Sequence, residues 1–332
     1  MKYIKNSEEL LSHGLVDLRK DALEIVDYAL LKSDPYVQVM NFVSLNGEIL
    51  KVGDLDFDIS GNRRIFILGA GKATYPIAKA LEDILGERIT AGAVTCKYGQ
   101  EGELKYSKLY HASHPTPDQA GYEASLEMME IARQTQPGDI VFACITGGST
   151  SLMPLPREGI TVEDLGLTYK LLLRSSANII EMNAVRKHLC SIKGGGLAKV
   201  IHPKADIINL TVSDVIGDML DYITCPTVPD TSTFDDARAT LEKYQLWDKL
   251  PASVTSFLKT AGPEMETYKD LSDHNIHNFI IVKGDAACEG AEEKAREIGY
   301  NTFILSTMLE GESKEVGAVY AAIAKEVLLN NR

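Results

Sequence analysis

The fold is decided by a short apolar run and the glycine-rich turn after it, where Asp139-Ile140-Val141-Phe142-Ala143-Cys144-Ile145 leads directly into Thr146-Gly147-Gly148-Ser149-Thr150-Ser151. An apolar run of this length bounded by glycine is typical of a buried strand. The same arrangement occurs earlier, where Arg64-Ile65-Phe66-Ile67-Leu68 precedes Gly69-Ala70-Gly71-Lys72. Strands that alternate with helices predict an α/β fold with a mostly parallel sheet covered on both faces. Ligands bind such a sheet beyond the carboxyl ends of its strands.

The alternation extends over most of the chain. It follows a helical pattern over residues 7–43, in which Asp34-Pro35 starts a second helix. The expected strands are 64–68, 91–95, 108–111, 139–145, 206–212, 278–282 and 301–305. The expected helices are 72–85, 119–133, 161–174, 176–187, 194–201, 233–245, 251–261, 285–297 and a final helix that carries Val316, Tyr320, Ile323 and Val327.

We expect three regions in the 332 residues, a length that corresponds to about two domains of roughly 150 residues each. Residues 1–45 are expected to form a helical lead-in that packs on the main domain, and 46–265 to form that α/β domain. Residues 266–332 are expected to form a partial second α/β segment, because two strands and two helices are too few to close a domain of their own.

The composition excludes several classes of protein. The net charge of −13, with 45% hydrophobic and 24% charged residues, indicates a soluble globular chain and argues against a nucleic-acid binder with a basic surface. No apolar run approaches the roughly 18 residues of a membrane helix, and the first residues lack the apolar core of a secretory signal. We therefore expect a cytoplasmic protein that contacts neither membrane nor nucleic acid. An anionic ligand would have to be held by local groups, because the overall charge repels it.

The cysteines agree with a reducing compartment. They are far apart, odd in number and never in a CxxC pair: Cys96, Cys144, Cys190, Cys225 and Cys288. This spacing favours small buried thiols over a zinc site or a disulfide framework.

The turn Gly69-Ala70-Gly71-Lys72 is the first candidate anion site. Glycines let a ligand approach the backbone, a helix start supplies N–H donors, and Lys72 adds a positive charge. The turn matches neither standard nucleotide motif, since a Walker A loop requires glycine in place of Phe66 and Ser or Thr in place of Ala73, and a dinucleotide fingerprint requires Gly or Ala in place of Thr74. The spacing alone supports an anion site and an ordinary turn about equally.

Two more glycine-rich turns follow in the same region. The segment 146–151 has more small polar residues than a tight turn needs, and the absence of glycine at Ser151 distinguishes it from the nucleophile elbow of serine hydrolases. Lys193-Gly194-Gly195-Gly196 is a third helix start with its own lysine. Three such starts in one alternating region favour anion binding over turns alone.

Asn183, Arg186 and Lys187 share one face of a predicted helix, at positions i, i+3 and i+4. The arginine offers a planar fork for a carboxylate or a phosphate. A solvated charged face is the usual explanation for such a run, but the turn at Lys193 follows directly.

Two carboxylates and one histidine complete the candidates. Asp214 and Asp218 flank Gly217 after the strand 206–212, where they would suit a magnesium ion that bridges phosphate oxygens, or one of them would accept the proton of a substrate hydroxyl. The alternative is an Asx turn with a helix cap. His114 lies in a loop made rigid by prolines, where it is as well placed to hold the loop as to contact a substrate.

These segments, in this order, resemble the glycerate 2-kinase family, whose members have an N-terminal Rossmann-like domain and a C-terminal MOFRL domain. The resemblance covers about residues 20–250, and the ordered set is more specific than any one motif. The matching segments are Gly69-Ala70-Gly71-Lys72-Ala73, His114-Pro115-Thr116-Pro117-Asp118, Gly147-Gly148-Ser149-Thr150-Ser151-Leu152, Glu181-Met182-Asn183-Ala184-Val185-Arg186-Lys187-His188-Leu189, Lys193-Gly194-Gly195, Ser213-Asp214-Val215-Ile216-Gly217-Asp218 and Pro226-Thr227-Val228-Pro229-Asp230. Residues 309–317 look like the segment that leads into the MOFRL domain.

The resemblance implies a Rossmann-like three-layer sandwich and ATP- and Mg²⁺-dependent phosphoryl transfer to the 2-hydroxyl of D-glycerate, giving 2-phosphoglycerate. It assigns catalysis to Lys72, Asp214 and Arg186. It assigns ATP binding to Gly69, Gly71, Gly147, Gly148, Ser149, Ser151, Lys193 and Gly194. Asn183, Lys187 and His114 would contact the small hydroxy acid, and Asp214 and Asp218 would bind the metal.

The sequence departs from the family pattern in several places. The usual arginine after Lys-Gly-Gly is Gly196, a usual Ser-Gly is Thr224-Cys225, and an acidic residue often found after Asp218 is Met219. The family also continues beyond the position of Arg332 with a domain on the order of 100 residues.

These departures leave three hypotheses. The first is a kinase subunit or truncated kinase, expected as a homo-oligomer, that is active only when the MOFRL domain is supplied, for which a second polypeptide is one source. The second is a non-catalytic anion-binding or regulatory paralogue. The third is a hydroxypyruvate reductase, against which the mismatch at Thr74 counts.

Overall fold

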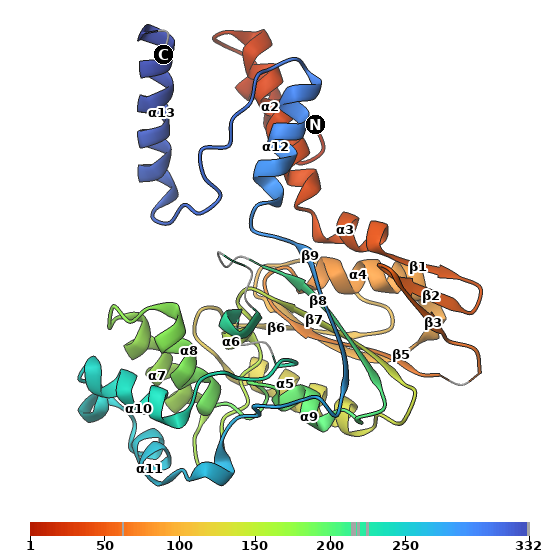
Figure 1. The fold of residues 1–332 in the computed structure, drawn as a ribbon, viewed down its shortest axis with the longest axis vertical. Helices are drawn as coiled ribbons and strands as arrows, with labels where there is room; N and C mark the ends of the chain where they lie inside the picture. Colours follow the sequence, from red (N-terminus) through yellow and green to blue (C-terminus); the bar gives the residue numbers. More distant parts are fainter. Residues whose placement is uncertain (62, 214–216, 218–219, 224–225, 331–332) are drawn as a thin grey trace.

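A six-stranded sheet forms the centre of the molecule, and all its neighbouring strands are parallel (Figure 1). The computed structural model describes residues 1–332 apart from 62, 214–216, 218–219, 224–225 and 331–332. The strands are β4 (Ile65–Ala70), β5 (Ile89–Lys97), β6 (Lys108–Ala112), β7 (Ile140–Thr146), β8 (Asp206–Val212) and β9 (Asn275–Val282). Their order in space, β6-β5-β4-β7-β8-β9, is that of the Rossmann fold, so the predicted fold class is confirmed.

Helices cover both faces of this sheet. Side chains alternate along each strand, so Leu68 faces a core with α5 (Gln119–Arg133) and α9 (Gly196–Val200), whereas Ile67 faces a second core. The elements over this second face are α3 (Pro35–Phe42), α4 (Thr74–Leu85), β1 (Val43–Asn46), β2 (Ile49–Val52) and β3 (Leu55–Asp58). Every residue of β4 and β7 is buried, as expected for strands covered on both sides.

The antiparallel sheet β1-β2-β3 was not expected from the sequence, which indicated only a stretch with several glycines. Gly47 and Gly53 have φ angles of +62° and +59° in the two turns. Leu50 and Phe57 lie in the core shared with the main sheet, so packing stabilises these short strands.

Four helices beside the sheet form a cluster with a core of its own (Figure 1). They are α7 (Val162–Leu173), α8 (Ile179–His188), α10 (Phe234–Lys243) and α11 (Ala252–Thr260). An Asn178 and Glu181 capping box begins α8, so its position along the chain is well defined. The shorter helical segments are α1 (Ser7–Leu10), α6 (Ser149–Leu152), Gly86–Arg88, Leu220–Ile223, Trp247–Lys249 and Pro263–Met265.

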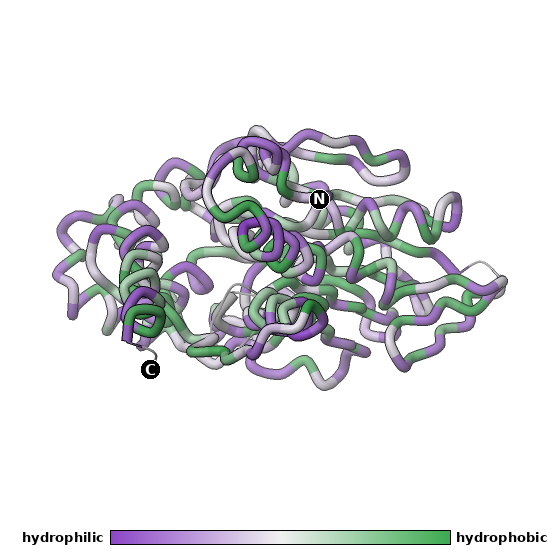
Figure 2. The backbone as a smooth tube through the Cα atoms, turned by 90° about the horizontal axis from the view of Figure 1, so that it is seen from above, coloured by the Kyte–Doolittle hydropathy of each residue, from purple (hydrophilic) through white to green (hydrophobic). Residues whose placement is uncertain are grey.

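Segments from the two ends of the chain pack together above the sheet (Figure 1). The helix α2 (Val16–Lys32) lies against α12 (Ala286–Glu297), where Lys32 Nζ pairs with Glu293 Oε2 at 2.8 Å. The last helix, α13 (Ser313–Asn330), has no buried residue and carries both hydrophobic and hydrophilic residues (Figure 2).

Two findings concern the last part of the chain. The strand β9 comes from the predicted third region, yet it pairs with β8 as the edge of the main sheet. The predicted strand at 301–305 is wrong: these residues are irregular, and Phe303 is 81% exposed. No strand lies beside them in the described part of the chain, and an apolar run without a neighbour has no ladder to join. The boundaries of the three regions stay a prediction.

Candidate functional site

The first two glycine-rich turns meet where the strand order reverses, between β4 and β7. Lys72 N donates to the carbonyl oxygen of Gly147 at 2.9 Å, and Ala73 N donates to Thr146 Oγ1 at 3.1 Å. Ligands of open α/β sheets bind in the crevice at this switch point. The structure therefore brings two of the predicted anion-binding turns together at the expected edge of the sheet.

Packing requires the glycines of the first turn. A Cβ atom at Gly69 would lie 2.2 Å from the carbonyl oxygen of Cys144, and one at Gly71 would lie 1.9 Å from Thr146 Oγ1. Gly71 also has a φ of +148°, which other residues rarely adopt. The close approach of β4 and β7 thus accounts for both glycines, and their predicted contact with ATP stays a prediction.

Lys72 and His114 converge on Gly148, which has a φ of +91°. A Cβ atom there would lie 3.2 Å from Lys72 Cγ and 3.0 Å from His114 Cδ2. The loop of His114 also packs on the helical cluster, since Thr116 Cγ2 would lie 3.2 Å from a Cβ atom at Gly166. Groups at the ends of β4, β6 and β7 therefore share one place beside α7.

The predicted phosphate loop 146–151 forms a helical turn, α6, directly after Gly148. Ser149 is buried, and Ser151 Oγ donates to the carbonyl oxygen of Gly148 at 3.2 Å. The turn continues to Met153, whose carbonyl oxygen accepts a 3.0 Å hydrogen bond from Lys193 Nζ. The second and third glycine-rich segments are thereby linked.

Arg186 is the most informative member of the site. It is only 7% exposed, and its guanidinium lies over the ring of Tyr169 with its central carbon 5.1 Å from the ring centroid. Nη1 donates to Asn183 Oδ1 at 3.4 Å, and Nε has no hydrogen-bond partner among the described residues. Burial lowers the pKa of Arg186, because a low-dielectric environment disfavours its charged form.

Lys193 is a second buried cation, at 2% exposure. Burial is the largest cause of its lowered pKa, and the positive charge of Arg186 acts in the same direction. Within the described part of the chain, neither cation forms an ion pair with a carboxylate. Two neighbouring buried cations without counter-ions are what an anion-binding site requires.

Lys187 follows Arg186 in the sequence but, unlike it, forms ion pairs with carboxylates. Its Nζ lies 2.7 Å from Asp221 Oδ1 and 2.5 Å from Asp230 Oδ1. Burial alone would raise the pKa of Asp230, but the ammonium of Lys187 and nearby hydroxyl donors hold it below its ordinary value. The contacts give Lys187 a structural ion pair, and its predicted contact with substrate stays a prediction.

The third turn packs tightly against this ion pair. Gly194 has a φ of +56°, and a Cβ atom there would lie 3.2 Å from Asp230 Cβ. A Cβ atom at Gly196 would lie 2.0 Å from the carbonyl oxygen of Ser191. The backbone therefore excludes the arginine that the resemblance associates with position 196.

Restoring that arginine with Gly196→Arg is expected to lower the free energy of unfolding by about 2–4 kcal/mol, because the side chain collides with backbone atoms. Chemical denaturation measures the change. The control is Gly317→Arg in α13, where nothing lies within 4 Å and a better helix former should stabilise the chain by up to about 1 kcal/mol. Equal stabilities for the two variants would contradict the prediction.

The predicted metal ligands Asp214 and Asp218 lie outside the described residues, as do Met219 and 224–225. In the part of the chain that the structure does describe, no group of three or more His, Cys, Asp or Glu side chains is placed to hold a metal ion. The magnesium site therefore stays a prediction.

Two residues that the sequence analysis gave no role contribute to the site. Asp230 ends the segment Pro226–Asp230, so its place in a motif was the signal that it mattered. Tyr169 carried no signal beyond helical periodicity, although it lies under Arg186. A contact between side chains of two helices leaves no pattern in a single sequence.

A buried histidine ties α8 to the segment after α11. His188 Nδ1 lies 2.6 Å from the carbonyl oxygen of Ala184, and Nε2 lies 2.5 Å from Glu266 Oε1. Burial would raise the pKa of Glu266, but the N–H groups of Phe234 and Thr267, together with His188, lower it to about 2.

The replacement Glu266→Gln is expected to lower the free energy of unfolding by about 2–3 kcal/mol at pH 7. Because the folded-state pKa is depressed, the stabilising effect of Glu266 is complete above its ordinary pKa and is lost as pH falls toward about 2. Urea denaturation of both proteins across this range measures the difference. The exposed Glu264→Gln is the control, and a Glu266 effect that does not shrink at low pH would contradict the prediction.

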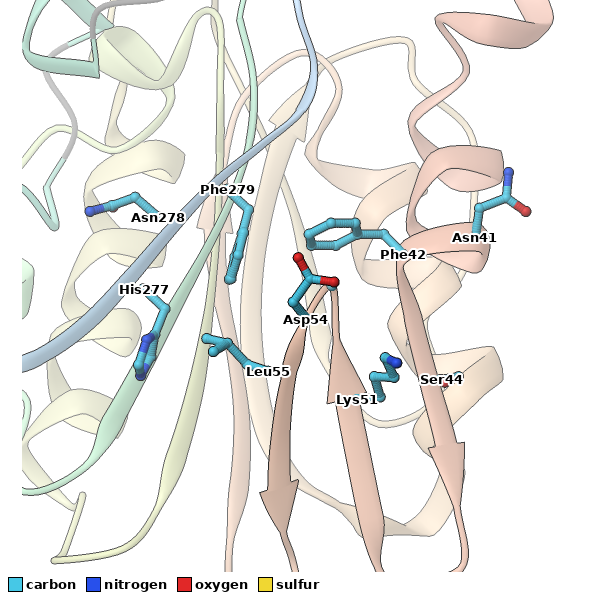
Figure 3. Close-up of a pocket in the computed structure, with 10 residues that line it drawn as sticks. Asn41, Phe42, Ser44, Lys51, Asp54, Leu55, His277, Asn278 and Phe279 are labelled. Carbon is cyan, nitrogen blue, oxygen red and sulfur yellow. The ribbon is translucent and has the colours of Figure 1, made fainter.

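A cavity of about 680 Å³ lies elsewhere, between the β1–β3 sheet and β9 (Figure 3). The rings of Phe42 and Phe279 line it and pack edge to face with their centroids 5.1 Å apart, and Lys51, Asp54 and His277 add polar groups. None of the predicted site residues lines this cavity. In the part of the chain that the structure covers, no helix is long and apolar enough to cross a membrane.

Comparison with known proteins gives consistent matches. Residues 21–259 match the family described as "Domain of unknown function (DUF4147)". The chain is 40% identical over 321 residues to a protein of Pyrococcus horikoshii named glycerate 2-kinase, and the aligned region covers 96% of this chain and 71% of that protein. It is 38% identical over 271 residues to a protein of Thermotoga maritima named D-glycerate 2-kinase, and this alignment covers 81% of this chain and 63% of that protein. The crystal structure of a glycerate kinase from Thermotoga maritima superposes with a TM-score of 0.77 at 34% identity, over 95% of this chain and 71% of that one.

Proposed function

This chain belongs to the glycerate kinase family, and from that premise we propose that it transfers the terminal phosphoryl group of ATP to the 2-hydroxyl of D-glycerate. A bond forms between the 2-oxygen and phosphorus while the bond to ADP breaks, and the hydroxyl proton is lost, giving 2-phosphoglycerate. The observation that carries the proposal is the pair of buried cations, Arg186 and Lys193, which have no carboxylate partner among the described residues. Phosphoryl transfer depends mostly on positioning and on electrostatic stabilisation, and buried cations supply both.

Each group has a proposed part in this reaction. Lys72 and Lys193 neutralise the transferring phosphates; Lys72 lies beside Gly148, and Lys193 is held by the carbonyl oxygen of Met153 at the end of the same turn. Arg186, held by Asn183, binds the carboxylate of glycerate or a phosphate through its planar fork. Asp214 would accept the hydroxyl proton or, with Asp218, would hold Mg²⁺.

Magnesium belongs to this proposal only through the sequence. When bound, Mg²⁺ would offset the negative charge of the phosphates. Both aspartates assigned to it lie outside the described residues, so we derive no step through the metal.

The length of the chain bears on its activity. The chain spans 71% and 63% of the lengths of the two relatives named above. That it has the activity of a whole relative is therefore part of the proposal. We propose that turnover needs the part of these relatives that the chain does not match, on the same or on a second polypeptide, and that the protein is a homo-oligomer. A cytoplasmic location is supported by the unpaired thiols of the four described cysteines.

The two alternatives lack a supporting contact. A reductase would need a nucleotide against the turn at Thr74, where the side chain instead donates to the carbonyl oxygen of Cys144 at 3.1 Å. A non-catalytic paralogue would keep the cations for binding alone, and the assay below separates it from a kinase.

A coupled assay of ADP formation tests the proposal, with ³¹P NMR to identify the product. The chain is mixed with ATP, Mg²⁺ and D-glycerate, alone and with the separately expressed C-terminal part of the Pyrococcus horikoshii relative. We expect 2-phosphoglycerate in the mixture with both polypeptides. Binding of glycerate in calorimetry without turnover in either mixture would favour the regulatory alternative, and NADH oxidation with hydroxypyruvate would favour the reductase. The absence of both turnover and glycerate binding would exclude the kinase.

A further inference from the structure

We propose that Tyr169 is a positioning residue for Arg186, holding its guanidinium by one face so that the Nε and Nη2 edge receives the anionic group of the substrate. This inference rests on the proposed function and names a residue of that same site. Tyr169 lies on α7 and Arg186 on α8, so the two helices of the cluster carry the contact between them.

The contact uses the face of the guanidinium. A cation is attracted to the electron-rich face of an aromatic ring, and the contact is stronger where water is excluded. Tyr169 is 1% exposed and Arg186 is 7% exposed, so this contact is desolvated. A guanidinium bound by its face keeps all its N–H donors available in the plane.

The in-plane donors are occupied unequally. Nη1 donates to Asn183 Oδ1 at 3.4 Å, whereas Nε is buried and has no partner among the described residues. A buried N–H donor without a partner is costly, so a ligand that accepts from Nε gains the most on that edge. A carboxylate or phosphate oxygen pair accepts from Nε and Nη2 together in the side-on bidentate geometry.

The ring, not the hydroxyl, performs the positioning. The hydroxyl of Tyr169 is buried and has no hydrogen-bond partner among the described residues. Burial raises the pKa of Tyr169 well above its ordinary value, so the phenol stays neutral. A neutral ring orients Arg186 without cancelling its charge, whereas a carboxylate in the same place would compete with the substrate.

The test compares Tyr169→Phe with Tyr169→Leu in the complete kinase mixture and in binding of inorganic phosphate to the chain. We expect the phenylalanine variant to stay within about twofold of the parent, and the leucine variant to raise the glycerate KM and the phosphate Kd about tenfold. In an Arg186→Gln background, Tyr169→Leu should have no further effect, because the ring acts only through Arg186. If the leucine variant does not fold, Tyr169→Met replaces it.

Several outcomes overturn the inference. They are equal loss in the phenylalanine and leucine variants, no loss in either, a tyrosine effect that persists without Arg186, and no phosphate binding by the parent chain. Phosphate binding that depends on the ring, without any turnover of glycerate, would leave the inference standing and remove the proposed function. Turnover of glycerate together with a leucine variant that has no effect would support the proposed function and remove the inference.

Discussion

Glutamine in place of Arg186 is expected to lower kcat/KM for glycerate about 100- to 1000-fold, and the folded chain should lose no stability. The reason is that Arg186 is a buried cation with no described carboxylate partner, so folding carries an uncompensated charge that the substrate later neutralises. Removing the charge relieves that cost and removes the binding group together. Turnover in the complete mixture and chemical denaturation of the chain measure the two effects.

The adjacent Lys187 provides the matched control for stability. Lys187→Gln removes the closer ammonium partner of buried Asp230 and leaves only Lys269 Nζ, 4.0 Å from Oδ2, so we expect a loss of about 3 kcal/mol. Arg133→Gln, an exposed change on α5, is the control for activity and should be silent. The prediction is contradicted if Arg186→Gln destabilises the chain as much as Lys187→Gln, since Arg186 would then be structural.

The main sheet was predictable because a buried parallel strand is a continuous apolar run. The predicted bounds of 206–212 agree with β8, and those of 139–145 differ from β7 by one residue at each end. The small sheet β1–β3 was not predictable, because strands of four residues show too little alternation of apolar and polar residues. Packing on α4 and the main sheet stabilises them instead. The run at 301–305 has strand-like composition but no neighbouring strand among the described residues.

The candidate site was predictable to a different extent. The glycine-rich turns can be recognised in the sequence, and two of them lie together at the switch point of the sheet. Which lysine is paired and which is not could not be predicted, because Lys187 and Lys193 have the same chemistry until Asp221 and Asp230 are placed. Spacing identifies a helix face, whereas ion pairing depends on segments distant in the sequence.

This pairing explains how a chain with a net charge of −13 can still bind an anion. Carboxylates neutralise Lys187, but the described carboxylates leave Arg186 and Lys193 unpaired in a buried place. A small number of buried cations can therefore bind an anion although the surface is acidic, because their field is screened far less than that of surface charges.

Alanine in place of Gly69 is expected to lower the free energy of unfolding by about 4 kcal/mol or to prevent folding. The new Cβ atom would lie 2.2 Å from the carbonyl oxygen of Cys144, so β4 and β7 would have to separate at the centre of the sheet. The three atoms nearest the new Cβ are the carbonyl group and the Cβ of Cys144, none of which is the flexible end of a side chain that could yield. Chemical denaturation, or the yield of folded chain, measures the effect.

The control for Gly69→Ala is Gly317→Ala, a helical glycine with nothing within 4 Å of its Cβ position, where alanine should stabilise the chain by up to about 1 kcal/mol. The contrast separates the collision from the general effect of replacing glycine. It also separates two roles of the first turn. If Gly69→Ala folds normally and only weakens ATP binding, the glycine serves the ligand; if the chain unfolds, the glycine serves the close approach of β4 and β7, on which the placement of Lys72 beside Gly148 depends.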